Sequence, residues 1–310
     1  MVRVMQKEDC HFRRLSDGTQ IPSVGLGVYQ VSEQTVQDLV YEALEVGYRL
    51  FDSAQAYHNE DGVARGIAAW LKHAPGRRRE DVYFTTKINT QNHGYEATKK
   101  SLEKSLHAAG PLGYIDLVLV HAPMSDRTRR LGTWQALEEA VVEGQVRSIG
   151  VSNYGQQHLS ELLGWEGLKI RPVVNQVEIN PWLCRQELVQ YCRENNIAVQ
   201  AFSPLMRGKR LDDPILQKVA HQYDKGVAQI LVRWSIQMGF IVLPKAAKKE
   251  RLAPNFDIWD FELSAETMSE LTHSDDYFVT VPGGIPRLMK AEVISTITDL
   301  QHETLVDMEA

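Results

Sequence analysis

Hydrophobic residues occur along this chain in two kinds of segment, short apolar runs and longer stretches with helical spacing of apolar positions. The short runs predict strands at residues 24–29, 48–53, 82–88, 115–121, 148–152, 173–179, 198–202 and 240–243. The longer stretches predict helices at 33–45, 60–72, 95–109, 131–143, 156–163, 185–194 and 214–238. Strands and helices therefore alternate from residue 24 to residue 243, which is typical of repeated β–α units on a parallel sheet.

Eight such units in one chain predict an α/β protein with a closed (β/α)8 TIM barrel. An open doubly wound sheet uses the same local units and is the structural alternative. Because no linker, charge block or low-complexity segment divides the chain, we expect one barrel domain over residues 1–310. Asp17-Gly18, between alternating residues, predicts an N-terminal β-hairpin. Residues 275–310 contain a Pro-Gly-Gly-Ile-Pro turn cluster and a helical-looking end, and they predict a C-terminal tail near the barrel mouth.

Composition narrows the class of protein. The 310 residues are 43% hydrophobic and 24% charged, with a net charge of −6, so the chain has a globular core and lacks the basic balance of a nucleic-acid-binding protein. No apolar run approaches the roughly 20 residues of a membrane-spanning helix, and residues 1–15 contain no apolar leader segment. Three cysteines without CxxC spacing predict neither a disulfide framework nor a metal site. We therefore expect a cytoplasmic protein, as a monomer or weak homodimer.

Ionisable residues interrupt the apolar pattern at the ends of three consecutive predicted strands: Asp52, Lys87 and His121. In a barrel the carboxyl ends of the strands meet on one face, and active sites lie there. Tyr57 follows Asp52 by five residues and can reach the same place from the next loop. A single histidine at a strand end is more often a structural, hydrogen-bonded residue, and a single buried Asp–Lys pair fits a structural role as well as a functional one. The four residues together predict a site.

This set suits the delivery of a proton to a carbonyl oxygen. The phenol of Tyr57 has an ordinary pKa of about 10, which an adjacent Lys87 ammonium is expected to lower. Asp52 would keep Lys87 charged and oriented, and His121 would position the carbonyl oxygen by hydrogen bonding. None of these groups can supply a hydride, so a cofactor is implied.

The chain resembles the aldo-keto reductase superfamily from about residue 15 to residue 264. The resemblance rests on motifs in order: GYRLFDSA at 47–54, Tyr57, Asn59-Glu60, TTK at 85–87, DLVLVH at 116–121, IGVSN at 149–153, NQVEINP at 175–181, FSPL at 202–205, and LPK at 243–245 followed by Arg251 and Asn255. Each motif alone has low specificity, whereas the ordered set is specific. The resemblance implies that Asp52, Tyr57, Lys87 and His121 form the family's catalytic tetrad.

The resemblance also implies a nicotinamide cofactor site. By this resemblance, the nicotinamide carboxamide is bound by Ser152, Asn153 and Gln176, and the nicotinamide ring stacks on Phe202. The pyrophosphate lies along Ser203 and Leu205, and the adenosine end is bound by Lys245, Arg251 and Asn255. The two cations in the last group favour NADPH, because they can bind its 2′-phosphate. Two departures from the family pattern, Ala246 and Pro254, each remove one expected contact at the adenosine end.

Other departures fall where the family binds substrate. Tyr29 replaces a frequent pocket tryptophan and is the expected substrate residue, residues 88–93 lack the usual aromatic side chain, and the loop at 122–126 is short. The leading interpretation is NADPH-dependent reduction of a small-molecule aldehyde or ketone, with the proton supplied by Tyr57. The alternatives are a non-catalytic, NADPH-binding regulatory protein, and a specialised-metabolite enzyme of the same fold that performs dehydration or isomerisation.

Overall fold

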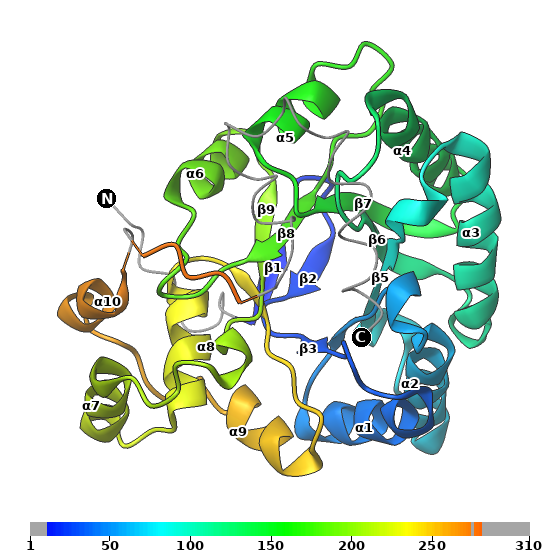
Figure 1. Ribbon diagram of the computed structural model, residues 1–310. Helices are drawn as coiled ribbons and strands as arrows, with labels where there is room; N and C mark the ends of the chain where they lie inside the picture. The colour runs from blue at the N-terminus through cyan, green and yellow to red at the C-terminus, as the bar shows by residue number, and fades with distance from the viewer. Residues whose placement is uncertain (1–10, 274–275, 281–310) are drawn as a thin grey trace.

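In the computed structural model, which describes residues 11–273 and 276–280, eight parallel strands form a barrel inside a ring of helices (Figure 1). The strands pair in chain order from the first to the last, and isolated bridges from Val24 to Val242 and from Gly27 to Lys245 join the two ends. The strands are β3 (Leu26–Gly27), β4 (Leu50–Asp52), β5 (Tyr83–Ile88), β6 (Ile115–Val120), β7 (Val146–Ser152), β8 (Val174–Glu178), β9 (Ala198–Phe202) and β10 (Ile241–Leu243). The predicted TIM barrel is therefore confirmed, and the open doubly wound sheet is wrong.

The helices of the described chain lie outside the barrel. They are α1 (Glu33–Val46), α2 (Glu60–His73), α3 (Tyr95–Ala108), α4 (Arg127–Val142), α5 (Gln156–Leu163), α6 (Gln186–Glu194), α7 (Pro214–Tyr223), α8 (Val227–Gln237), α9 (Leu252–Phe256) and α10 (Ala265–Leu271). The single helix expected at 214–238 is two helices, α7 and α8. The left-handed backbone of Asp224 (φ 51°) ends the first, and Gly226 begins the second. Within the described residues, no helix combines the length and the apolar character needed to cross a membrane.

The predicted hairpin is present as β1 (Phe12–Arg14) and β2 (Gln20–Pro22), which pair antiparallel. In its turn, the Thr19 amide donates to Asp17 Oδ1 at 2.9 Å, and Gly18 adopts a φ of +91°. The other oxygen of Asp17 accepts a hydrogen bond from Ser148 Oγ, near the amino end of β7, at 2.6 Å. Ile21 is completely buried against apolar residues of the barrel strands. The hairpin therefore covers the amino-terminal end of the barrel, opposite the face expected to hold the site.

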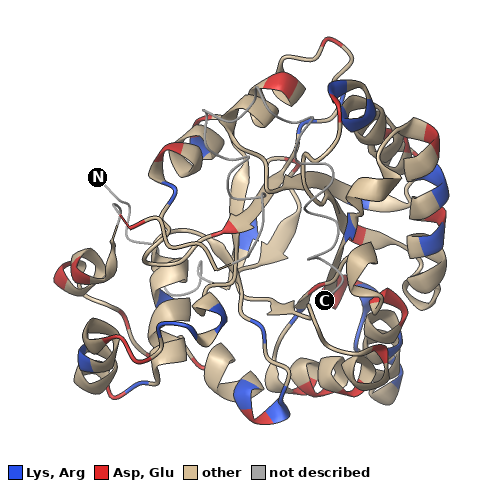
Figure 2. Ribbon diagram, viewed as in Figure 1, with Lys and Arg blue, Asp and Glu red and all other residues tan. Residues whose placement is uncertain are grey.

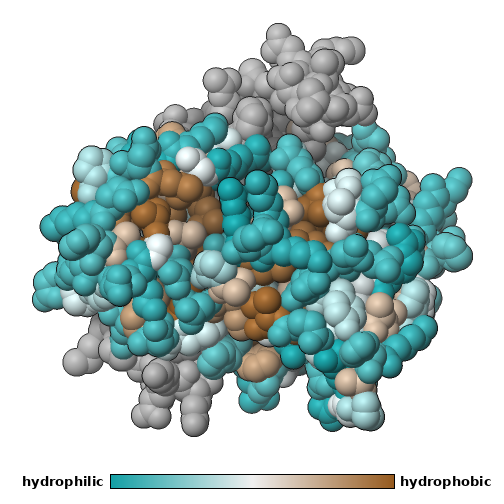
Figure 3. All heavy atoms as spheres, turned by 90° about the horizontal axis from the view of Figure 1, so that it is seen from below, coloured by the Kyte–Doolittle hydropathy of each residue, from teal (hydrophilic) through white to brown (hydrophobic). Residues whose placement is uncertain are grey.

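The main core lies between the sheet and the helices. All residues of β5 and β6 are buried, as barrel strands with helices outside them require. Three tryptophans are among the largest fully buried side chains: Trp134, Trp182 and Trp234. Hydrophilic side chains cover most of the face in Figure 3, and charges of both signs are interspersed on the outer helices in Figure 2.

Three short 3-10 turns follow the carboxyl ends of barrel strands: η1 (Gln55–Tyr57), η3 (Thr90–Asn92) and η5 (Met206–Gly208). The remaining 3-10 turns are η2 (Arg79–Asp81), η4 (Gly110–Leu112) and η6 (Lys249–Arg251). The predicted C-terminal tail lies outside the described residues from residue 281 onward, so its place near the mouth and the single domain over 1–310 stay predictions. At residue 280 the chain is held against β8, because the Thr280 amide donates to Glu178 Oε1 at 2.9 Å.

Candidate active site

The lysine at the end of β5 brings three of the predicted site residues together. Lys87 Nζ donates to Asp52 Oδ2 at 2.6 Å and to the Tyr57 hydroxyl at 3.4 Å. Its third hydrogen bond goes to the backbone carbonyl of Ser53 at 2.8 Å. An ammonium group has three donors, so each N–H of Lys87 has a partner. The strand ends of β4 and β5 and the turn η1 thus converge on one nitrogen.

Both charges of this arrangement are buried, so each must be balanced by the other. The Lys87 side chain is 1% exposed and the Asp52 side chain 5% exposed. A lone buried charge of either sign would be strongly unfavourable, so each requires the other. Burial lowers the pKa of Lys87, but Asp52 and Tyr57 raise it by more, and the net pKa lies above its ordinary value. Lys87 is therefore an ammonium ion.

The pKa of Tyr57 corrects one expectation from the sequence. Burial raises this pKa, Lys87 lowers it by a smaller amount, and the net direction is upward. Lys87 therefore acts in the expected direction but does not bring the pKa below its ordinary value, because desolvation of the phenolate is the larger effect. Tyr57 is a neutral phenol that carries its proton at neutral pH.

His121 lies directly after β6, with its ring edge-on to the Tyr57 ring at a centroid distance of 5.8 Å. Burial, Lys87 and His93 together lower the pKa of His121 to about 3. The imidazole is neutral at physiological pH and can donate or accept a hydrogen bond without carrying charge. All four residues of the expected tetrad therefore lie together, at the carboxyl ends of β4, β5 and β6.

Three of the expected cofactor residues form a hydrogen-bonded group with Asp52. Gln176 Nε2, on β8, donates to Asp52 Oδ1 and to Gln200 Oε1, each at 2.7 Å. Ser152 Oγ, at the end of β7, donates to the Gln176 carbonyl at 2.9 Å. Asn153 Nδ2 donates to the His121 carbonyl at 3.0 Å, from a left-handed backbone (φ 59°). The amide side chains expected at the nicotinamide are therefore oriented by the same groups that surround Lys87.

Phe202 ends β9, and Ser203 and Leu205 lie in the loop that follows it; these are the residues expected along the nicotinamide ring and pyrophosphate. Ser203 and Met206 have left-handed backbones, with φ of 50° and 49°. Non-glycine residues in this region are strained, and such strain is concentrated where backbone shapes a ligand site.

Arg207, in the same loop, is a residue that the sequence interpretation missed. Its guanidinium carbon lies 5.6 Å from the centroid of the Tyr29 ring, and that ring lies 5.0 Å from the ring of Tyr57. Arg207 also lowers the pKa of Lys245, as does burial, the larger cause. Within the described part of the chain, neither cation pairs with a carboxylate. A signal was available, because this arginine lies two residues after Leu205, the last of the expected pyrophosphate residues.

The adenosine-end residues lie on one segment after β10. Lys245 forms an isolated parallel β-bridge with Gly27 through its backbone. Arg251 ends η6 and is exposed, and Asn255 lies in α9. Asn255 is buried, and its side-chain nitrogen Nδ2 has no hydrogen-bond partner among the residues that the structure describes. An unpartnered buried amide and cations without counter-charges fit an anionic dinucleotide, since both types of group are unfavourable when left unsatisfied. The residues present therefore suit the expected cofactor.

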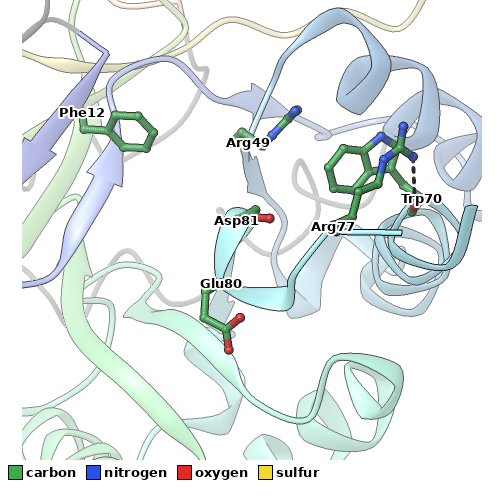
Figure 4. A pocket seen from close by; sticks show the side chains of 7 residues that line it. Phe12, Arg49, Trp70, Arg77, Glu80 and Asp81 are labelled. Carbon is green, nitrogen blue, oxygen red and sulfur yellow. Dashed lines mark hydrogen bonds between the residues drawn. The ribbon is translucent and has the colours of Figure 1, made fainter. Parts of the chain in front are cut away.

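A separate cavity of about 560 Å³ lies at the other end of the barrel (Figure 4). Its lining includes Arg49 and Arg77, whose guanidinium groups lie 4.7 Å and 4.1 Å from the Trp70 ring. Arg49 donates to the Leu44 carbonyl at 2.8 Å, and Arg77 donates to the Trp70 carbonyl at 2.9 Å. These arginines satisfy carbonyls near the ends of α1 and α2, and none of the expected site residues lies in this cavity.

Two further polar residues beside the expected tetrad were missed as well. Ser53 supplies the carbonyl that accepts from Lys87, and Gln200 accepts from Gln176 within the barrel. Gln200 stands as a polar residue inside the apolar strand β9, which is a visible sequence signal. A backbone contact such as that of Ser53 leaves no signal in a single sequence.

Comparison with known proteins agrees with this geometry. Residues 23–276 match the model of the Aldo/keto reductase family. An uncharacterized oxidoreductase of Saccharomyces cerevisiae is 45% identical over 267 residues, which cover 86% of this chain and 95% of the relative. The glyoxal reductase of Bacillus subtilis is 41% identical over 259 residues, or 83% of this chain and 90% of the relative.

Among solved structures, the aldo-keto reductase of Bombyx mori in complex with NADP superimposes with a TM-score of 0.81 at 36% identity, covering 88% of this chain and 95% of that one. The family model spans most of the chain, and the relatives are similar over nearly their whole length. The resemblance inferred from the ordered motifs is thus confirmed. The chain belongs to the Aldo/keto reductase family and is an NAD(P)H-dependent oxidoreductase.

Proposed function

We propose that this protein reduces an aldehyde or ketone to an alcohol with NADPH, and that Tyr57 supplies the proton. The observation that carries the proposal is the environment of Lys87 Nζ, which contacts Asp52 Oδ2 at 2.6 Å and the Tyr57 hydroxyl at 3.4 Å. A neutral phenol beside a fixed ammonium can release a proton, because the ammonium stabilises the phenolate that forms.

The cofactor would supply the hydride when bound. The residues that would hold it follow the assignment above: Ser152, Asn153 and Gln176 at the carboxamide, Phe202 at the ring, Ser203 and Leu205 at the pyrophosphate, and Lys245, Arg251 and Asn255 at the adenosine end. Support for this placement comes from the unpartnered Nδ2 of Asn255 and from the proximity of Lys245 to Arg207, a second cation. The Bombyx mori structure with NADP is that of a related protein and favours the same cofactor class here.

His121 and Tyr29 would receive the substrate. A neutral His121 can orient the carbonyl oxygen toward Tyr57 without competing as an acid, because its pKa is about 3. Tyr29 is 37% exposed and packs against the Tyr57 ring, so it would form an aromatic wall of the pocket. Because a relative is named a glyoxal reductase, small aldehydes and dicarbonyl compounds are the first substrates to test.

The test is NADPH oxidation with a panel of aldehydes, ketones and dicarbonyl compounds, for the wild type and Tyr57→Phe. We expect Tyr57→Phe to reduce kcat by at least about a hundredfold, which is a usual contribution of a positioned acid. Tyr41→Phe is the matched control, because Tyr41 contacts His73 on the outer helices and lies outside the site. Its kcat should equal that of the wild type.

Two other results would overturn the proposal in different ways. Tight NADPH binding without turnover of any carbonyl would favour a regulatory protein. Equal kcat in the wild type and Tyr57→Phe would remove Tyr57 from the proton step and reopen dehydration or isomerisation. A cytoplasmic location and a monomeric or weakly dimeric state remain predictions, which fractionation and sedimentation would test.

A further inference from the structure

Gln55 stands two residues before Tyr57 in the turn η1 and has no part in the chemistry described above. Its side chain makes four hydrogen bonds. Oε1 accepts from the Asn89 backbone amide and from Asn92 Nδ2, each at 2.9 Å. Nε2 donates to the Ser101 carbonyl and to Ser105 Oγ, each at 3.1 Å. A glutamine side chain offers two donor hydrogens and two acceptor lone pairs, so its hydrogen-bonding capacity is fully used.

The partners of Gln55 belong to two elements that η1 does not otherwise contact by side-chain hydrogen bonds. Asn89 and Asn92 lie in the segment that leaves β5, and Ser101 and Ser105 lie on α3. Asn89 follows Lys87 by two residues and is the first residue after β5. Gln55 therefore attaches the turn that carries Tyr57 to the segment that directly follows the strand carrying Lys87, and to α3.

The backbone hydrogen bonds of the turn do little to fix its orientation. Its backbone bonds are short-range, from the Tyr57 amide to the Ala54 carbonyl at 2.9 Å and from the His58 amide to the Gln55 carbonyl at 3.3 Å. A left-handed residue, His58 (φ 53°), ends it. A 3-10 turn with only such backbone bonds is not rigid by itself. Besides the contacts of Tyr57 with Lys87, Tyr29 and His121, the side chain of Gln55 adds four hydrogen bonds that attach the turn to neighbouring elements.

We propose that Gln55 is a positioning residue that holds the Tyr57 hydroxyl at Lys87 and couples this turn to the segment at residues 89–92. This inference rests on the proposed function of Tyr57 as the proton donor. The contact from Lys87 Nζ to the Tyr57 hydroxyl is 3.4 Å, near the limit for a hydrogen bond, so a displacement of a few tenths of an ångström weakens it. The geometry of the acid thus depends on the four bonds of Gln55.

The test uses Gln55→Met, which keeps the side-chain volume and removes every hydrogen bond. Gln237→Met is the matched control. Gln237 is also half-buried, and it bonds to Arg233 Nε at 3.0 Å, to the Leu263 amide at 2.8 Å and to the Leu263 carbonyl at 2.9 Å, on the far side of the helical ring. Both variants should lose stability. Only Gln55→Met should lower kcat, by about tenfold, with the dissociation constant of NADPH changed less than twofold.

Two readouts separate positioning from loss of structure. When Tyr57 is less tightly held at Lys87, its pKa should rise, so the alkaline limb of the kcat profile should move to higher pH in Gln55→Met and stay in place in Gln237→Met. In a Tyr57→Phe background, Gln55→Met should leave the residual rate unchanged, because the hydroxyl it positions is gone.

Equal losses of kcat in Gln55→Met and Gln237→Met, or an unshifted alkaline limb, would overturn the positioning role. So would a tenfold further loss in the Tyr57→Phe background. The proposed function has its own failure, in which Tyr57→Phe alone retains wild-type kcat. The two failures are therefore distinguishable in one set of variants.

Discussion

Lys87 and Asp52 form an ion pair inside the barrel, with Nζ and Oδ2 separated by 2.6 Å and both side chains almost completely buried. Each charge is held by further hydrogen bonds, from Lys87 to Ser53 and from Gln176 to Asp52. The pair lies at the carboxyl ends of adjacent strands, β4 and β5, where the site is expected. This buried pair contributes both to the stability of the fold and to the chemistry of the site, and substitutions can separate the two contributions.

Removing one charge should be more harmful to stability than removing both. Asp52→Asn or Lys87→Met leaves an unpaired buried charge and should lower the free energy of unfolding by about 3–5 kcal/mol. The double variant should recover most of this loss, because no buried charge remains, while all three variants lack reductase activity. Denaturant unfolding and NADPH oxidation measure the two effects. The exposed pair Lys218–Glu270, at 2.7 Å, is the control, and Lys218→Ala should change stability by less than about 1 kcal/mol.

The cations near the expected cofactor site should differ in what they recognise. Lys245→Ala should raise the dissociation constant of NADPH by about tenfold or more and leave that of NADH nearly unchanged, if Lys245 binds the 2′-phosphate. Arg207→Ala should weaken both cofactors by the same factor, because Arg207 follows the residues expected along the pyrophosphate. Titration of protein fluorescence gives both constants. A loss confined to NADPH in Arg207→Ala would contradict the assignment, and Lys218→Ala should change neither value.

Buried histidines should make the protein acid-sensitive. Burial is the largest cause that lowers the pKa of His93 to about 4 and of His158 to about 4, and it also lowers the pKa of His121 to about 3. The unfolded chain then binds more protons than the folded chain below pH about 6.5, so stability is lost as pH falls from there toward 4.

The loss at pH 5 should reach at most about 2 kcal/mol for each of these histidines. His158→Leu should reduce the slope of the free energy of unfolding against pH between pH 4 and 6.5 by the contribution of one titrating group. Denaturant titrations at several pH values measure this slope. His73→Leu, at an exposed position of α2, is the control for the replacement of a histidine by leucine. An unchanged slope in His158→Leu would contradict the prediction.

Gly47 should be required for a backbone reason and a packing reason. Its φ is +122°, and a Cβ atom there would lie 2.8 Å from the Phe256 ring. Gly76 has a φ of +89°, and no atom of the described chain lies within 4 Å of such a Cβ, so it isolates the backbone effect. We expect Gly76→Ala to lose about 1–2 kcal/mol of stability and Gly47→Ala to lose at least about 1 kcal/mol more. Thermal unfolding compares them, and equal losses would show that Phe256 moves aside freely.

Much of the candidate site could be inferred without the structure, because its residues interrupt apolar strands at their carboxyl ends. Asp52, Lys87 and His121 are polar groups at positions where a buried strand should be apolar, and strand direction in a parallel barrel brings them to one face. Helix boundaries were less accessible. The break between α7 and α8 depends on the left-handed Asp224, a conformation that the helical spacing of the apolar residues does not reveal.

The sequence by itself determined the alternation of strands and helices, the order of the motifs and the face on which the charged residues meet. These properties follow from local periodicity and from chain direction, which every segment carries within itself. The tertiary structure alone decided that Gln55 attaches the Tyr57 turn to the segment after β5, that Arg207 lies over Tyr29, and that the pKa of Tyr57 is raised. Those outcomes depend on burial and on contacts between residues far apart in the chain, and the sum of desolvation and charge at one atom exists only once the whole barrel has closed.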